Sequence, residues 1–342
     1  MLARVLALAT GLTAPMGFFS GAATAEPPTM KAIRYHEAGG PDKLVLEDAP
    51  IPAPGDDEML VRVHAAAVNP VDAKIRARGP SSGGRFPSIP GYDVSGVVEA
   101  AGKAVTKFKV GDEVFAYLSL QRAGGYAEYA IVKESEAAKK PAKLTHTEAA
   151  AVPLAALTAW QALVDTAKLD KGQSVLIHGG SGGVGSFAVQ IAHARGAKVY
   201  ATASDKNLAF LKELGADVAI DYKATKFEDV AKDVDVVFDT VGGDTQARSF
   251  GVLKKGGIIV SIVGMPDKQK ADGAGVRAAG ILVKPSATQL EEIAALIDQG
   301  KIKPEVSLLL PLAEARKAQE QIATGHTRGK IVLSVVAEPA KK

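Results

Sequence analysis

Five glycines stand close together in the segment IHGGSGGVGSFAVQ, which spans residues 177–190. The segment follows an apolar run and opens a pattern of apolar residues with helical spacing. Glycine permits a tight turn and lets a phosphate approach the backbone, where free N–H groups and the helix dipole hold its charge. Because G-x-G-x-x-G here lies between a predicted strand and a predicted helix, it indicates a dinucleotide site rather than an empty turn. The turn residues predicted to contact the cofactor are Gly180, Gly182, Gly183, Val184 and Gly185.

The residues after the next predicted strand bear on the choice between NAD and NADP. An acid at the tip of that strand accepts hydrogen bonds from the ribose 2′-hydroxyl of NAD and repels a 2′-phosphate. Asp205 has the spacing of such an acid, but it falls beyond the strand, where it can cap the next helix. Ser204 and Lys206, with Tyr222 from the following strand, can hold a 2′-phosphate instead. The sequence therefore favours NADP, and the alternative for Lys206 is a solvated lysine.

The elements that must position these residues follow two patterns. From Met30 to Val152, short strands alternate with Gly and Pro, which is typical of an antiparallel, partly closed barrel. One of these strands, EMLVRVHAAAVN, alternates as a half-buried strand does. After Pro153, apolar runs alternate with helical patterns, which predicts an α/β unit with a parallel sheet covered on both faces. Its six predicted strands are SVLIHG, KVYATAS, DVAIDY, DVVFDTVG, GIIVSIVG and GILVKP.

The residues after Pro285 contain a predicted helix and a last strand, KIVLSVV. They follow a complete six-stranded unit, so we expect them to return to the first unit. The predicted division places residues 30–152 and 286–342 in one domain and residues 153–285 in the dinucleotide-binding domain. The loosest predicted loop covers residues 265–275.

Composition excludes several classes of function. A net charge of +3, from 41 basic and 38 acidic residues, gives no signal for a nucleic-acid partner. The chain has no cysteine, so disulfides, thiolate zinc sites and cysteine nucleophiles are excluded. The six histidines show no metal-binding spacing, and no metal site is predicted.

The first 25 residues differ from the rest of the chain. A basic start, a short apolar stretch and the sequence ATA before Glu26 predict a signal peptide over residues 1–25, and hence a periplasmic or secreted protein. The alternative is a cytoplasmic protein that starts at Met30. The apolar part is too short to span a bilayer, and no integral membrane span is predicted.

Several motifs occur in a recognisable order: VNPVDAKIR, FPSIPGYDVSGVV, AAAVPLAALTAWQAL, HGGSGGVG, FDTVGG and GHTRGKIVL. With these motifs the chain resembles the zinc-independent medium-chain dehydrogenase/reductase family and, within it, the zeta-crystallin-like NADPH quinone oxidoreductases. The resemblance covers residues 30–336. It implies a GroES-like substrate domain, an inserted Rossmann domain with a doubly wound six-stranded sheet, and a homodimer. The nicotinamide and the substrate would lie in the cleft between the domains.

The resemblance also bears on the chemistry. Zinc-dependent relatives carry Cys where Asn69 lies and a His-Glu pair where Tyr92 and Asp93 lie, so hydride transfer to an acceptor that needs no zinc is implied. Quinones and α,β-unsaturated carbonyls are such acceptors. Asn69 would then face the nicotinamide and the acceptor oxygen, the alternative being an Asn-Pro turn. Lys74 stands where some relatives carry a substrate-side Tyr. We expect Tyr92 and Tyr126 to pack rather than act as acids.

The remaining assignments are cofactor contacts implied by the resemblance. Thr158 matches a threonine that contacts the cofactor in relatives, the alternative being a hydroxyl bonded to its own helix. Gly242 and Gly264 follow strands that face the cofactor. Arg328 is either a cofactor contact or a surface charge, and we expect a contact. The rival interpretations of the whole chain are an enoyl-thioester reductase and a non-catalytic NADPH-binding protein.

Overall fold

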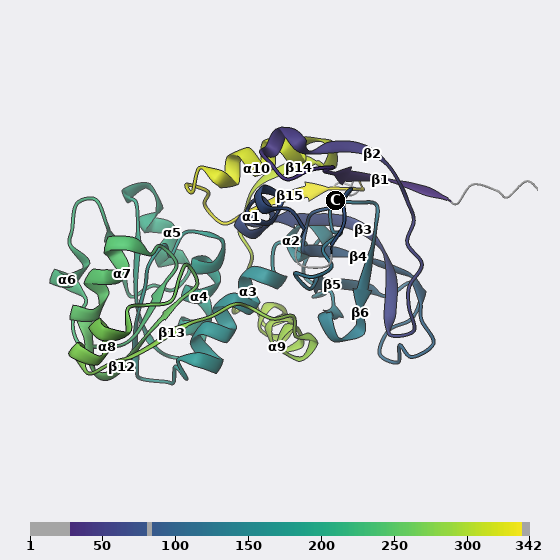
Figure 1. Cartoon of the computed structure of the whole chain (residues 1–342). Coiled ribbons are helices and arrows are strands. Elements are labelled where there is room, and N and C mark those ends of the chain that lie inside the picture. Colours follow the sequence, from purple (N-terminus) through teal and green to yellow (C-terminus); the bar gives the residue numbers. More distant parts are fainter. Residues whose placement is uncertain (1–27, 81–83, 337–342) are drawn as a thin grey trace, which may run out of the picture.

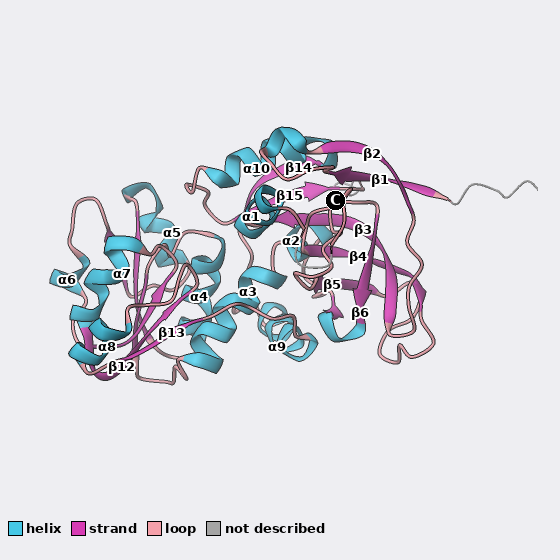
Figure 2. Ribbon diagram, viewed as in Figure 1, coloured by secondary structure: helices cyan, strands magenta, loops and turns pink. Residues whose placement is uncertain are grey.

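The computed structural model describes residues 28–80 and 84–336. It shows two units, with α3 (Pro153–Trp160) and α9 (Ala287–Asp298) between them (Figure 1). One unit alternates strands with helices, and the other consists mainly of strands (Figure 2). The signal peptide predicted over residues 1–25 lies outside the described residues.

A parallel sheet forms the centre of the alternating unit. Its strands are β8 (Ser174–Ile177), β9 (Lys198–Ala203), β10 (Val218–Asp221), β11 (Val234–Asp239), β12 (Leu253–Ser261) and β13 (Arg277–Gly280). Their order in the sheet is β10-β9-β8-β11-β12-β13, and every neighbouring pair is parallel. This is the doubly wound order, in which the chain starts at the centre and winds outward in both directions. The predicted α/β fold class is confirmed.

The helices of this unit are α4 (Gly183–Ala194), α5 (Leu208–Glu213), α6 (Phe227–Val230), α7 (Gly243–Ser249) and α8 (Lys268–Ala274). Two predictions here were wrong. The sixth strand is RAAG rather than GILVKP, because Ile281 and Val283 of that apolar run pack against the core between the two units. The predicted loop over 265–275 contains α8, whose N-terminus is capped by the side chain of Asp267.

The second unit is built on a seven-stranded sheet and a separate two-stranded ribbon. The ribbon is β1 (Thr29–Arg34) with β2 (Val45–Pro50). The sheet contains β3 (Glu58–Val68), β4 (Asp93–Ala101), β5 (Glu113–Tyr117), β6 (Tyr129–Lys133), β7 (Ala137–Lys139), β14 (Val306–Pro311) and β15 (Lys330–Ser334). Its order is β14-β15-β3-β4-β5-β7, with β6 also paired to β3. The other helices are α1 (Pro70–Arg78), α2 (His146–Ala150) and α10 (Ala315–Ala323).

The expected return of the chain to this unit is visible in the pairing of β15 with β3. The sheet is not wholly antiparallel, however, because α10 carries the chain from β14 over to a parallel β15. β3 was also predicted as half-buried, yet only Glu58, Arg62 and His64 in it are partly exposed, since both of its faces are covered. The exact division at residues 152/153 and 285/286 stays a prediction.

The two units share a core. One continuous buried cluster includes Phe115 of β5, Phe187 of α4 and Ile293 of α9. The helices between the units are therefore packed on both sides, which fixes how the strand-rich unit faces the glycine turn. In the described part of the chain, no helix combines the length and the apolar character needed to cross a membrane.

Candidate functional site

The glycine turn lies between β8 and α4, as predicted, and it is held by the neighbouring strand. The N–H of Gly180 donates to the carbonyl of Thr202 (2.9 Å), and the N–H of Gly179 donates to the hydroxyl of Thr202 (3.2 Å). A Cβ on Gly185 would lie 2.2 Å from the carbonyl oxygen of Gly179. Gly185 is therefore required by packing inside the turn itself.

The outer side of the turn has room and hydrogen-bond donors. A Cβ on Gly182 would meet no atom nearer than 3.4 Å. α4 begins at the next residue, and the N–H groups of Gly183, Val184 and Gly185 in its first turn have no acceptor within the helix. Open space in front of free N–H groups at a helix N-terminus suits a phosphate. The residues present therefore fit the pyrophosphate of a dinucleotide.

The residues predicted to hold a 2′-phosphate lie where β9 and β10 end. β9 ends at Ala203 without a carboxylate, and Asp205 lies beyond it in a short, exposed 3-10 turn. Ser204 is partly buried and Lys206 is exposed. The N–H of Tyr222 donates to the carbonyl of Ala203 (3.1 Å), which brings the end of β10 beside Ser204. The structure thus brings these polar groups together, and their contact with a cofactor stays a prediction.

Gly242 and Gly264 lie at the same edge of the sheet, after β11 and β12. Asp239, which sequence analysis missed, shapes this edge: its carboxylate accepts hydrogen bonds from the N–H of Gly242 (2.8 Å) and the hydroxyl of Ser261 (3.0 Å). Gly242 has φ +81°, a conformation that favours glycine. The signal available in the sequence was an acid at the end of an apolar strand, directly before TVGG.

The segment before β15 reaches the glycine turn from the other unit. The N–H of Gly329 donates to the carbonyl of Ser181 (2.9 Å). The guanidinium of Arg328 lies over the ring of Phe210 (4.8 Å) and forms an ion pair with Glu305. Arg328 is therefore close to the turn, but its charge is already compensated by Glu305, and its contact with a cofactor stays a prediction.

Thr158 is buried in α3, and its hydroxyl donates to the carbonyl of Leu154 (2.7 Å). This is the geometry expected if the hydroxyl of Thr158 is bonded to its own helix. A hydroxyl that donates to its own helix still has lone pairs, so its role as a cofactor contact stays a prediction.

Asn69 lies at the end of β3, where it is buried and precedes the first residue of α1. Its amide nitrogen donates to the carboxylate of Asp93 (2.9 Å), and its amide oxygen accepts from the ammonium of Lys330. Its backbone N–H donates to Asp72 (2.7 Å), which is the contact expected of an Asn-Pro helix start. The contact expected of a helix start is therefore present, whereas the contact of Asn69 with a nicotinamide or an acceptor stays a prediction. Lys74 is exposed on α1 and takes no part in this cluster.

Asp93 joins three segments of the chain. One carboxylate oxygen accepts from the N–H of Leu154 at the start of α3 (2.7 Å), and the other lies 3.4 Å from the ammonium of Lys330. Burial raises the pKa of Asp93, while Lys330, Asn69 and the N–H of Leu154 oppose that effect. Sequence analysis named Asp93 only as a departure from zinc relatives and missed Lys330. A lysine opening the apolar strand KIVLS was the available signal.

A second buried carboxylate lies next to Asn69. The hydroxyl of Tyr126 donates to Asp72 (2.7 Å), and burial raises the pKa of Asp72 to about 7. Burial beside Asp72 also raises the pKa of Tyr126 well above its usual value, so its phenol stays protonated. This agrees with the expectation that Tyr126 packs. Asp72 and Tyr126 are far apart in the sequence, so the spacing of sequence motifs could not predict that they are in contact.

The groups at the zinc positions of relatives do not fit a zinc ion. Asn69 offers an amide whose oxygen and nitrogen are both engaged, and the ammonium of Lys330 lies between Asn69 and Asp93. A cation there would be repelled by the ammonium. Over residues 28–80 and 84–336, no three His, Cys, Asp or Glu side chains are grouped so as to hold a metal ion.

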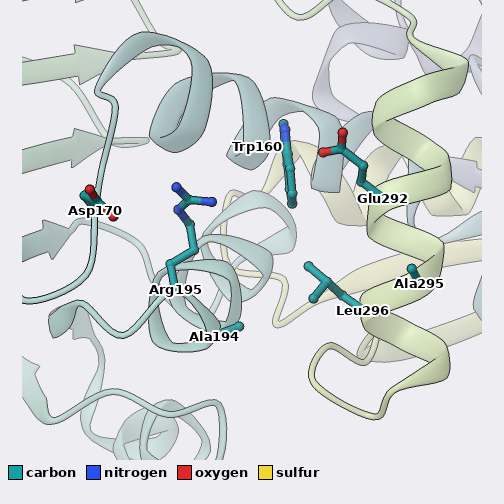
Figure 3. A pocket seen from close by; sticks show the side chains of 7 residues that line it. All are labelled: Trp160, Asp170, Ala194, Arg195, Glu292, Ala295 and Leu296. Atoms are coloured by element: carbon teal, nitrogen blue, oxygen red, sulfur yellow. The ribbon is translucent and has the colours of Figure 1, made fainter.

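A hollow of about 510 Å³ is lined in part by residues of α9 (Figure 3). Ala194 and Arg195 in its wall lie at the end of α4 opposite the helix N-terminus. The hollow is therefore not the dinucleotide site. Its wall consists of Trp160, Asp170, Ala194, Arg195, Glu292, Ala295 and Leu296.

The chain matches two families of known proteins. Residues 55–142 match the family described as "Alcohol dehydrogenase GroES-like domain", and residues 214–333 match the one described as "Zinc-binding dehydrogenase". The first range falls in the strand-rich unit, and the second runs from the parallel sheet into β15.

Three similar proteins carry the name of a reductase or an oxidoreductase. The chain is 39% identical over 319 residues to the chloroplastic NADPH-dependent alkenal/one oxidoreductase of Arabidopsis thaliana, covering 90% of this chain and 80% of that protein. It is 38% identical to 2-methylene-furan-3-one reductase of Solanum lycopersicum, covering 90% and 79%. Its structure is similar to that of the quinone oxidoreductase from Coxiella burnetii, with TM-score 0.83, 38% identity, and coverage of 90% of this chain and 100% of that one.

Proposed function

Because this chain belongs to the medium-chain dehydrogenase/reductase family, in its zeta-crystallin-like branch, we propose that it reduces quinones or α,β-unsaturated carbonyls with NADPH. The observation that carries the proposal is the position of Asn69. Its amide lies in a buried polar cluster that Lys330 connects to the glycine turn. A polar side chain fixed beside a dinucleotide turn suits orientation of a nicotinamide and an acceptor.

NADP is the proposed cofactor, and a reduced nicotinamide supplies the hydride when it is bound. The outer side of the Gly182–Gly185 turn would hold the pyrophosphate, with Thr158, Gly242, Gly264 and Arg328 proposed as further contacts. Ser204, Lys206 and Tyr222 would hold the 2′-phosphate. Two observations favour NADP over NAD: β9 carries no carboxylate at its end, and Lys206 is exposed in the turn that follows β9.

We propose that the reaction needs no zinc, because the side-chain oxygens of Asn69 and Asp93 that could bind a metal accept hydrogen bonds from the Lys330 ammonium. A quinone or enone spreads its developing negative charge over several atoms, so one amide hydrogen bond suffices where a simple carbonyl would need a Lewis acid. Asn69 is the proposed donor, and Lys74 is the proposed substrate-side residue of α1. The proton is proposed to come from water or from a hydroxyl of the cofactor.

The test uses a stopped-flow instrument to monitor the oxidation of NADPH, with a panel of quinones and a panel of enones tried separately. Turnover of either panel is expected, with NADH giving a much lower kcat/KM. Binding of NADPH without turnover of any acceptor would refute the reductase and leave a cofactor-binding protein. Zinc content and activity after dialysis against a chelator check the metal: unchanged activity is expected.

A homodimer and a processed N-terminus are also proposed. Over residues 28–80 and 84–336, β13 is the last strand of its sheet, and its outer edge is unpaired and could pair with a second copy. Near the N-terminus of the described residues, the carbonyl of Pro28 accepts a hydrogen bond from the N–H of Ile51 (3.0 Å). A chain that starts at Glu26 keeps this bond, whereas a chain that starts at Met30 lacks it. N-terminal sequencing of the native protein distinguishes these two starts, and with them export from a cytoplasmic location.

A further inference from the structure

Lys330 is a charged residue that is 3% exposed, at the first position of β15. Its ammonium has an acceptor for each of its three N–H groups. These are the carbonyl of Val68 (3.2 Å), the amide oxygen of Asn69 and the carboxylate of Asp93 (3.4 Å). A buried ammonium with all its donors engaged is held in one place.

The same lysine also contacts the glycine turn. Gly329, the residue before it, forms a parallel bridge with Gly182. A Cβ on Gly183 would lie only 3.0 Å from Cδ of Lys330, so the aliphatic stem of the lysine passes directly over the turn. A shift of the turn would therefore displace the stem that carries the ammonium.

The ammonium decides how the Asn69 amide is turned. The amide oxygen must face the ammonium of Lys330, and the amide nitrogen must face the carboxylate of Asp93. In the flipped orientation two donors would face each other, and so would two acceptors. One N–H of that nitrogen is used by Asp93. The second has no acceptor within residues 28–80 and 84–336. A cation at the oxygen also polarises the amide, which makes this second N–H a stronger donor.

We propose that Lys330 is a positioning residue, which couples the glycine turn to Asn69 and holds the Asn69 amide with one N–H available to the nicotinamide or to the acceptor oxygen. The identity of the acceptor rests on the proposed function, whereas the coupling between Lys330 and Asn69 does not. If so, removing the Lys330 ammonium lowers kcat by disturbing Asn69. The same removal has little effect on kcat in a variant that already lacks the Asn69 amide.

A double-mutant cycle tests this coupling, with Lys330→Met, Asn69→Ala and the double variant. The dissociation constant and emission spectrum of bound NADPH, kcat, and KM for the acceptor are measured on each. Lys330→Met is expected to lower kcat about 10-fold or more, with KM changed less than about 2-fold. It should also shift the emission of bound NADPH. Adding it to Asn69→Ala should change neither kcat nor emission further, and Lys330→Arg should restore part of both.

Arg122→Met is the matched control, because Arg122 also forms a partly buried ion pair, with Glu136, outside the candidate site. Its effects should add to those of Asn69→Ala. Additive effects of Lys330→Met would overturn the proposal. If Lys330→Met fails to fold by circular dichroism, the Lys330→Met/Asp93→Asn variant, which removes both charges, takes its place. If wild type reduces no acceptor, the proposed function fails, and NADPH emission and affinity still decide the coupling.

Discussion

Gly185 packs so closely on Gly179 that a Cβ at position 185 would lie 2.2 Å from the carbonyl oxygen of residue 179. Three residues earlier, Gly182 has open space in front of it and an ordinary φ of −77°. The two glycines therefore serve different purposes. One is needed for the turn to close, and the other leaves room for what binds outside the turn.

Gly182→Ala should leave thermal stability nearly unchanged and weaken NADPH binding about 10-fold or more, since its methyl group takes the space of a phosphate. Gly185→Ala should instead lower the melting temperature by several degrees, because the backbone must shift. Thermal unfolding of the apoprotein and NADPH titration separate the two effects. Unchanged NADPH affinity in Gly182→Ala would contradict a pyrophosphate site at this turn.

Lys206→Ala should weaken NADPH binding about 10-fold and leave NADH binding within about 2-fold, because the lysine is proposed to contact the 2′-phosphate, which NADH lacks. Lys232→Ala is the control, since Lys232 is also exposed but precedes β11, at the amino ends of the strands. It should alter neither affinity. Equal losses for NADPH and NADH in Lys206→Ala would refute the 2′-phosphate role.

Local sequence patterns were sufficient to predict the fold class. They were not sufficient to predict the buried polar cluster of Asn69, Asp93 and Lys330. The G-x-G-x-x-G turn and the Val- and Ile-rich runs predicted the parallel sheet, because strand–turn–helix periodicity is local. Lys330 and Asn69 are 261 positions apart, and only the pairing of β15 with β3 brings them together. The apolar run at residues 280–285 misled for the same reason: Ile281 and Val283 in it pack against the core between the units, which no local pattern indicates.

A second copy of the chain should pair along β13. The N–H of Ile281 donates to Ser261 of β12, so by strand alternation the N–H of Ala278 points away from β12. Ala278→Pro removes that outward donor and leaves the bonds to β12 in place. Light scattering after size exclusion should show a dimer for wild type and for the control Ala278→Ser, and a monomer for Ala278→Pro. A dimeric Ala278→Pro would place the interface elsewhere.

Asp72 should make stability depend on pH in a direction opposite to that of an ion-paired carboxylate. Burial raises its pKa from 3.8 to about 7, so the folded state keeps a proton that the unfolded state releases. Its stabilising contribution is complete below pH 3.8 and is lost as the pH rises to about 7.

Asp72→Asn imitates the protonated form at every pH. The free energy of unfolding of wild type, minus that of Asp72→Asn, should therefore fall by about 1.4 kcal/mol per pH unit between pH 5 and about 7. Urea unfolding at several pH values measures it. Asp229→Asn, at an exposed position, should show no such slope, and a flat difference for Asp72→Asn would mean that Asp72 is ionised in the folded protein.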